Sequence, residues 1–188
     1  MSELLFNELP RPTFRWLRVN HTVSSLAGED TAVQSIAVEA NKDILSPLPV
    51  GTALLDGNYE GANKEAVHVL VEKAEGYAIN VPPKAKEVVG IRIDANARVA
   101  NRFQFIVGEG AELEVQFYVT GSGDALTNVS YLNEYDVKEA GKVVVKKVNL
   151  LPEHVQHIEH RYTKLEEKAD VEYINIEIGG SENILNYY

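Results

Sequence analysis

The chain contains no cysteine among its 188 residues. This absence excludes disulfides, thiolate ligation of zinc or of iron–sulfur clusters, and cysteine nucleophiles within the sequence given. Basic residues are also few, because 18 Lys and Arg stand against 28 Asp and Glu, which leaves a formal net charge of −10. Nucleic acid is therefore not an expected partner, since binding to phosphates needs clustered Lys and Arg.

Long apolar runs are missing as well. No window approaches the roughly 20 apolar residues of a membrane span, and the first 20 residues lack the basic start and apolar stretch of a secretory signal. We therefore expect a cytoplasmic protein without membrane contact. Because 45% of the residues are hydrophobic, one domain with a substantial core is expected at this length.

The N-terminal region differs in character from the rest. Pro10 and Pro12 interrupt any helix there, and the single Trp of the chain, Trp16, lies among other apolar residues. We predict an arm over residues 1–29 that straps the open end of the protein's own core, with a partner-binding arm as the alternative. The core domain then spans residues 30–188.

Alternating apolar residues dominate the chain beyond Tyr77 and predict short strands bounded by Gly, Asn and Asp turns. The predicted strands are 77–81, 88–93, 102–107, 112–119, 128–135, 142–148, 154–162 and 170–178. Upstream, the pattern predicts a strand at 32–38, turns at 46–51 and 57–58, and a strand at 63–71. Many short strands without a long amphipathic helix indicate an all-β protein, which is a β-sandwich or jelly roll, a barrel, or a β-solenoid.

One phrase recurs along this β-rich region and separates these folds. Its copies are Glu109–Val115, Glu139–Val145 and Glu167–Tyr173, which start 30 and 28 residues apart. Each interval contains a second predicted strand, so one repeat is two strands and two corners. This spacing favours the stacked coils of a parallel β-helix. A jelly roll spaces its strands similarly and remains the alternative.

Four segments, taken in order, resemble the SufB/SufD proteins of the Suf iron–sulfur cluster assembly system, and SufD-like members in particular. The segments are LPRPTFRWL at 9–17, NRFQFIVGEGAEL at 101–113, KVNL at 147–150, and ADVEY at 169–173 leading to the Gly-Gly pair at 179–180. The absence of Cys agrees better with a SufD-like than with a SufB-like chain. The resemblance spans residues 9–180.

The resemblance implies a right-handed parallel β-helix that acts as a non-catalytic scaffold subunit. Its partners would be a SufB-like paralogue and a SufC-like ATPase, with ATP bound by the ATPase, an iron–sulfur cluster formed by the complex, and no cofactor held by this chain. Family members continue past the Gly-Gly pair with more coils and a helical segment, so we expect a chain truncated at its C-terminus. An uncapped solenoid end invites self-association, including a homodimer.

Three histidines, His154, His157 and His160, are the candidates for a metal site. On an extended strand, however, His154 and His160 would lie about 20 Å apart on one face, with His157 on the other. A cupin-like metal-binding protein is therefore one alternative function. A carbohydrate-active β-helix enzyme is another, because it needs two carboxylates held about 5–9.5 Å apart. Its candidate carboxylates are Glu109, Glu112, Glu114, Asp136, Glu139, Glu166, Glu167 and Asp170.

Overall fold

The computed structural model describes residues 4–6, 22–24, 36–55, 59, 64–122 and 127–188. Most of the predicted N-terminal arm, residues 1–29, lies outside the described residues. Within it, β1 (Leu4–Phe6) and β2 (Thr22–Ser24) pair antiparallel. The predicted turn at 57–58 also lies outside the described residues.

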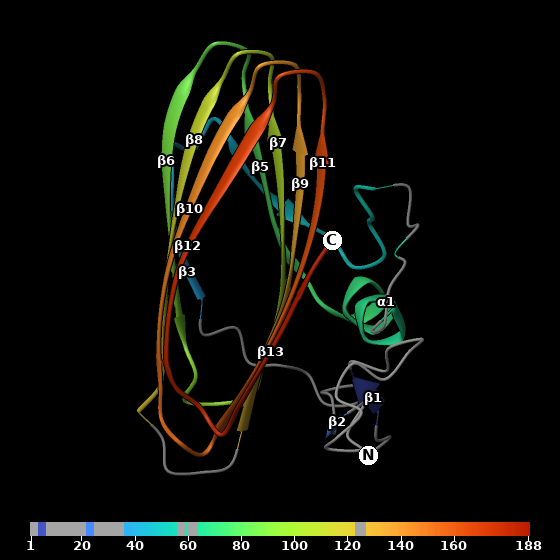
Figure 1. The fold of residues 1–188 in the computed structure, drawn as a ribbon, viewed down its shortest axis with the longest axis vertical. Coiled ribbons are helices and arrows are strands. Elements are labelled where there is room, and N and C mark those ends of the chain that lie inside the picture. The colour runs from blue at the N-terminus through green and yellow to red at the C-terminus, as the bar shows by residue number, and fades with distance from the viewer. Residues whose placement is uncertain (1–3, 7–21, 25–35, 56–58, 60–63, 123–126) are drawn as a thin grey trace, which may run out of the picture.

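Two β-sheets face each other and form the body of the molecule (Figure 1). Sheet I contains β3 (Ile36–Glu39), β6 (Lys86–Asp94), β8 (Glu112–Thr120), β10 (Lys142–Leu151) and β12 (Asp170–Gly179). Sheet II contains β4 (Leu45–Leu48), β5 (Gly76–Val81), β7 (Val99–Val107), β9 (Thr127–Val137), β11 (Val155–Leu165) and β13 (Glu182–Tyr187). From β5 onward the chain crosses from one sheet to the other at every corner.

This alternation makes a parallel β-solenoid of about 4 turns. Within sheet I, β6, β8, β10 and β12 are parallel neighbours, and β5, β7, β9, β11 and β13 are parallel neighbours in sheet II. The parallel solenoid predicted from the repeat is therefore confirmed. The jelly roll is wrong, because its strands would pair antiparallel.

The repeated phrase stacks in register at one corner of the solenoid. Gly110, Ala140 and Lys168 adopt positive φ angles of 62°, 55° and 58° at equivalent corner positions. The amide of Gly110 donates to the carbonyl of Glu139, and the amide of Ala140 donates to that of Glu167, both at 2.9 Å. These bonds continue the ladder between coils through the turn, which explains why the corner sequence recurs.

The prediction of a strand at 63–71 is wrong, because this segment forms α1 (Lys64–Lys73). Ala66, Val67, Leu70 and Val71 share one buried face at helical spacing, and that face packs against the outward side of sheet II. The alternation of β-branched residues was misleading, since Val67 and Val71 also lie one helical turn apart.

The predicted turn at 46–51 is wrong in its first half, because Leu45–Leu48 forms β4. β4 pairs antiparallel with β5 and lies at the edge of sheet II, with Pro47 opposite Tyr77. An edge position accommodates proline, since the missing amide faces away from the neighbouring strand. Together β3 and β4 place antiparallel strands at the N-terminal end of the solenoid.

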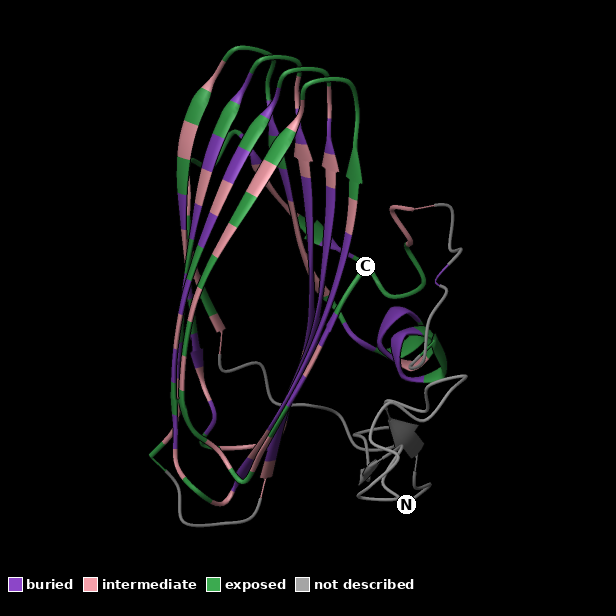
Figure 2. Cartoon of the chain, in the orientation of Figure 1, coloured by how far each residue is buried: buried purple, intermediate pink, exposed green. Residues whose placement is uncertain are grey.

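The interior of the first coils is apolar and aromatic. Phe103 and Phe105 from β7 lie fully buried with Phe117 from β8, and Phe105 stacks on Tyr135 at 4.7 Å between ring centroids. Figure 2 shows the buried strands of sheet II beside the alternating pattern of sheet I. In the part of the chain that the structure describes, no helix has the length and apolar character needed to cross a bilayer.

Candidate functional site

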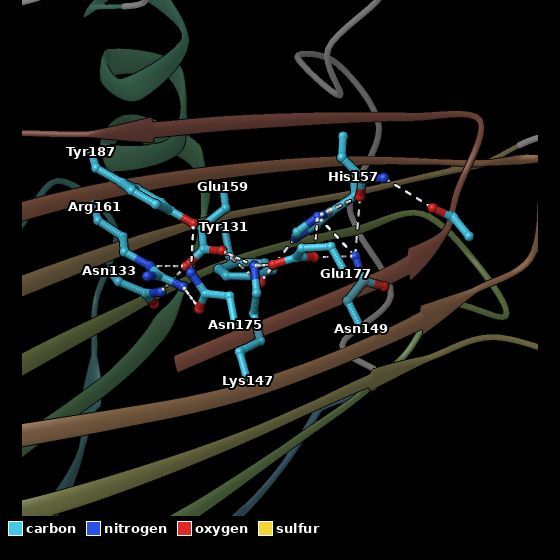
Figure 3. A network of polar contacts seen from close by, with 12 residues as sticks. Tyr131, Asn133, Lys147, Asn149, His157, Glu159, Arg161, Asn175, Glu177 and Tyr187 are labelled. Carbon is cyan, nitrogen blue, oxygen red and sulfur yellow. Dashed lines mark hydrogen bonds and ion pairs between the residues drawn. The ribbon is translucent and has the colours of Figure 1, made fainter. Parts of the chain in front are cut away.

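A buried cluster of charged and polar side chains occupies the interior of the last coils (Figure 3). The interior of the earlier coils is apolar. We call this buried cluster the ionic cluster. Its members are Tyr131, Asn133, Lys147, Asn149, His157, Glu159, Arg161, Asn175, Glu177 and Tyr187. They come from both sheets, so the cluster bridges the interior of the solenoid.

Lys147 is the central cation of the ionic cluster. Its Nζ forms ion pairs with Glu159 of sheet II and with Glu177 of sheet I. The side chains of Lys147 and Glu159 are fully buried, whereas that of Glu177 is 19% exposed. With Arg161, the ionic cluster contains two cations and two carboxylates. Buried charges need such opposite charges beside them.

Arg161 is the second cation, and three kinds of contact hold it. Its Nε donates to Glu159, and one Nη donates to the side-chain oxygen of Asn175 at 3.0 Å. Its guanidinium carbon lies 4.5 Å from the ring centroid of Tyr173 and 4.3 Å from that of Tyr187. The two aromatic faces compensate part of the lost hydration of the guanidinium.

His157 connects the ionic cluster to the corner of the last coil. Its Nε2 is 2.9 Å from the Tyr131 hydroxyl, and its Nδ1 is 3.1 Å from the side-chain nitrogen of Asn149 and from the side-chain oxygen of Asn183. Burial, reinforced by the charge of Lys147, lowers the pKa of His157 to about 4. The ring is therefore neutral at pH 7.

The carboxyl of Glu159 is ionised despite its burial. Burial alone raises its pKa, but the charges of Lys147 and Arg161 outweigh burial and hold the pKa at about 2. The same burial raises the pKa of Tyr131 far above its ordinary value, and the charge of Glu159 adds to the effect. Near neutral pH, Glu159 is therefore a carboxylate and Tyr131 a neutral phenol.

The three predicted histidines do not come together. His154 lies in the turn before β11, His157 points into the interior, and His160 lies on the outward side of sheet II, fully buried, where burial lowers its pKa to about 4. Across the described ranges, no three His, Asp or Glu side chains are arranged to hold a metal ion.

The ionic cluster was missed from the sequence. Inward positions of β10 read Val143, Val145, Lys147, and those of β11 include Glu159 and Arg161. One signal was available in the sequence. A charged residue that occupies an inward position of an alternating strand needs an opposite charge from another strand. The pairing itself depends on register between coils, which the sequence does not state.

A second candidate site is the outward face of sheet I, where side chains form rows across neighbouring strands. The first row reads Lys86, Glu112, Lys142, Asp170 from β6 to β12. Lys86 pairs with Glu112 at 2.8 Å between Nζ and Oε2. At the next outward position of β8, Glu114 pairs diagonally with Lys146 of β10, at 2.7 Å between Oε2 and Nζ. Acidic and basic strands thus alternate along this face.

The far half of the same face is apolar near β12. The exposed fractions of Ile174, Ile176 and Ile178 are 44%, 49% and 58%, and Val148 and Leu150 lie beside them on β10. Exposed isoleucines in one contiguous patch are typical of a surface that meets another molecule. β12 is also the last strand of sheet I in the strand order.

Two of the carboxylates predicted for a carbohydrate-active site lie close together, because Asp136 and Glu166 share the ammonium of Lys138, at 3.0 and 3.1 Å. Glu109, Glu139 and Glu167 lie at stacked corners, and Glu112, Glu114 and Asp170 lie in the rows of sheet I. Several have a lysine partner, such as Glu166 with Lys138 at 3.1 Å. Each lysine partner compensates an acid at or near the surface, and the carbohydrate-active alternative stays a prediction.

No protein-family model, no curated protein and no solved structure matches this chain.

Proposed function

We propose that the chain is a non-catalytic scaffold subunit of an iron–sulfur cluster assembly complex of the Suf type. Its partners are a SufB-like paralogue and a SufC-like ATPase, which supply the sulfur chemistry and the ATP hydrolysis. The chain itself binds neither ATP nor a metal ion, and it works in the cytoplasm.

The observation that carries the proposal is the fold. A parallel solenoid spans Gly76–Tyr187, the region that contains three of the four segments on which the resemblance to SufD-like proteins rests. A solenoid presents long flat faces, and one of these, the outward face of sheet I, carries the apolar patch of Ile174, Ile176 and Ile178. Such faces suit protein assembly. Because fold alone does not determine function, the assignment depends on identifying the partners.

The deciding experiment is co-expression of the tagged chain with the SufB-like and SufC-like proteins of its own source, followed by anaerobic purification. We expect a stable complex of defined stoichiometry in which the ATPase activity of the SufC-like subunit differs from that of the subunit alone. A tagged solenoid of unrelated sequence is the control bait. If the folded chain elutes alone at physiological salt, the proposal is wrong.

A further inference from the structure

A glycine lies in the middle of a central strand of sheet I without a reason inside the fold. Gly90 of β6 pairs with Glu39 of β3 on one side and with Gln116 of β8 on the other, so the ladder is continuous there. Its backbone has no positive φ angle. Among the described residues, a Cβ added to Gly90 would find its nearest contact, the Cβ of Glu39, at an ordinary 3.5 Å. Neither a bulge, a turn conformation nor crowding requires a glycine here.

Gly90 instead leaves a hollow on the outward face of sheet I, which we call the Gly90 hollow. Its volume is about 300 Å³, at the lower end of the range for small-molecule sites. The neighbouring strands β3, β6, β8 and β10 form it (Figure 1). The side chains around Gly90 are Glu39, Arg92, Gln116, Tyr118, Lys146 and Val148. A glycine within a strand commonly marks a place where a ligand approaches the backbone closely.

Two of the polar side chains that line the hollow are bound to a residue outside it. Nε2 of Gln116 donates to Oε1 of Glu114 at 2.6 Å, and Nζ of Lys146 donates to Oε2 of the same carboxylate at 2.7 Å. Glu114 is the preceding outward position of β8 and is not among the lining residues. The amide of Gln116 and the ammonium of Lys146 are thus bound within the chain.

The two remaining charged residues, Glu39 and Arg92, have opposite sign. In the part of the chain that the structure describes, neither forms an ion pair. Glu39 extends over the glycine, because its Oε2 lies 3.8 Å from the position of a Cβ on Gly90. The guanidinium carbon of Arg92 lies 5.9 Å from the ring centroid of Tyr118. A carboxylate and a guanidinium thus border one hollow without pairing with each other.

The same hollow has an apolar wall. Tyr118 is 42% exposed, and Val148 lies beside it at the paired position of β10. An exposed aromatic ring next to a valine accommodates an apolar group, and it can stack on a second ring. The Gly90 hollow therefore combines one negative group, one positive group and an apolar surface in one small volume.

The geometry points to the Gly90 hollow as a binding site for a zwitterionic small molecule, a free α-amino acid with an aromatic or large aliphatic side chain. Its ammonium pairs with Glu39, its carboxylate pairs with Arg92, and its side chain covers Gly90 beside Tyr118 and Val148. Glu39 and Arg92 stand at diagonal positions of adjacent strands, about 7–8 Å apart at the backbone, so one amino acid reaches both charged ends. This inference goes beyond the scaffold function proposed above and does not depend on it.

The probe is L-phenylalanine, titrated into the nitrogen-15-labelled full chain at about pH 6, where its amine is charged, and followed by amide chemical shifts. L-phenylalaninamide lacks the carboxylate and N-acetyl-L-phenylalanine lacks the ammonium, so they are the matched control ligands. We expect phenylalanine to bind with a dissociation constant on the order of 1 mM, because both ionic contacts face solvent. Each control ligand should bind about three- to fivefold more weakly, since it loses one contact. The shifts should concentrate in β3, β6 and β8.

Paired variants separate the two ionic contacts. Glu39→Gln should weaken binding of phenylalanine and phenylalaninamide but not of N-acetyl-phenylalanine. Arg92→Gln should weaken binding of phenylalanine and N-acetyl-phenylalanine but not of phenylalaninamide. Glu72→Gln, which neutralises an exposed carboxylate on α1, is the control and should change none of the three. Gly90→Val fills the hollow and should abolish binding of all three ligands.

The same glycine allows a test without a ligand. Gly90→Ala adds a side chain where the chain has space for it, so its melting temperature should equal or exceed that of the natural chain. A lower melting temperature would show that the fold itself requires the glycine, and the inference would lose its basis.

Three binding results would also overturn the inference. Absence of amide shifts up to the solubility limit of phenylalanine would show that the hollow is not an amino-acid site. Equal binding of phenylalanine and its two analogues would show an apolar surface without charge recognition. Binding that persists in the Gly90→Val variant would place the site elsewhere on the chain.

Discussion

Where one coil of the solenoid places Phe117 in the interior, the next coil places Lys147 at the register-equivalent position. In sheet II, the position of Phe103 becomes Asn133 in the next coil and Arg161 in the one after it. The backbone path is the same in both regions. One solenoid thus fills equivalent interior space by two different means: aromatic packing in the first coils, and ion pairs with polar hydrogen bonds in the last.

The two means differ in what they tolerate. An apolar interior loses stability in proportion to the volume removed, because the cavity costs dispersion and transfer energy. A buried ion pair gives little net stability over apolar residues of similar size, yet it fails badly when one partner is lost. The last coils should therefore be the more sensitive to a single charge change and the less sensitive to paired replacement.

Replacing Lys147 by Met is expected to have the largest effect, a loss of about 3–5 kcal/mol in the free energy of unfolding. The reason is that Glu177 loses its cation while Glu159 keeps only Arg161. Urea denaturation followed by circular dichroism measures the change. The Lys147→Met/Glu177→Leu double variant should recover most of the loss, and a double variant as unstable as the single one would contradict the proposed compensation.

Phe117→Ala should cost a similar amount, about 3–5 kcal/mol, through the cavity that it leaves among Phe103, Tyr131 and the neighbouring strands. The difference from the lysine variant is that Phe117→Ala leaves a cavity rather than an uncompensated buried charge. The loss for Phe117→Ala should stay the same from 50 mM to 1 M NaCl, as judged by urea denaturation at both concentrations. A strong salt dependence would mean that the two interiors are energetically coupled.

Acid should weaken the last coils before the first. The folded-state pKa of His157 is lowered from 6.5 to about 4, so below pH 6.5 the unfolded chain binds a proton that the folded chain does not. Stability is thus present above pH 6.5 and is lost as the pH falls toward 4, by up to about 3 kcal/mol for this residue. His160 adds a loss over the same range.

Melting temperatures measured between pH 7 and pH 4 test this expectation. The His157→Gln variant should show a shallower decline than the natural chain, because its loss from histidine protonation is removed. Below pH 4.5, protonation of unfolded Glu159 continues the decline, since the folded-state pKa of that carboxyl is about 2. A flat profile from pH 7 to 4 would contradict the buried, neutral state of His157.

The smallest effect belongs to the outward rows. Lys146→Ala removes the pair with Glu114, whose partners are both partly exposed, and should change the free energy of unfolding by about 0.2–1 kcal/mol. The effect should vanish at high salt. Lys147 is the next residue along β10. If Lys146→Ala lowered the free energy of unfolding as much as Lys147→Met does, alternate side chains of β10 would not separate surface from interior.

Much of the solenoid could be predicted from alternation and from the repeat, because both signals are local. The eight strands predicted after Tyr77 coincide with β5 to β12, whereas β13 was not predicted. The corner phrase at Glu109, Glu139 and Glu167 stacks in register. α1 was mistaken for a strand, since Val67 and Val71 fit either period, whereas Leu70 shares their face only in a helix, the face that packs against sheet II.

The candidate site was less predictable than the fold. Lys147 meets Glu159 across the interior and Glu177 on the next coil, so both contacts depend on strand register and sheet separation. A histidine triplet is visible as a motif, whereas a lysine at an inward position is visible only once inward and outward are known. The sequence therefore pointed to His154 and His160, which do not contact each other. It did not point to Lys147, Glu159 and Glu177, which do.

The stacked corners at Gly110, Ala140 and Lys168 have a mechanical consequence. Apart from α1, which packs across β9, β11 and β13, each coil is tied only to its neighbours, so once α1 is detached, pulling on the two chain ends should peel the solenoid apart one coil at a time. A coil of 28 or 30 residues would release roughly 100 Å of contour length when stretched. Single-molecule force traces should then show evenly spaced steps, with the Lys147→Met variant yielding at lower force in the coils that contain the substituted strand.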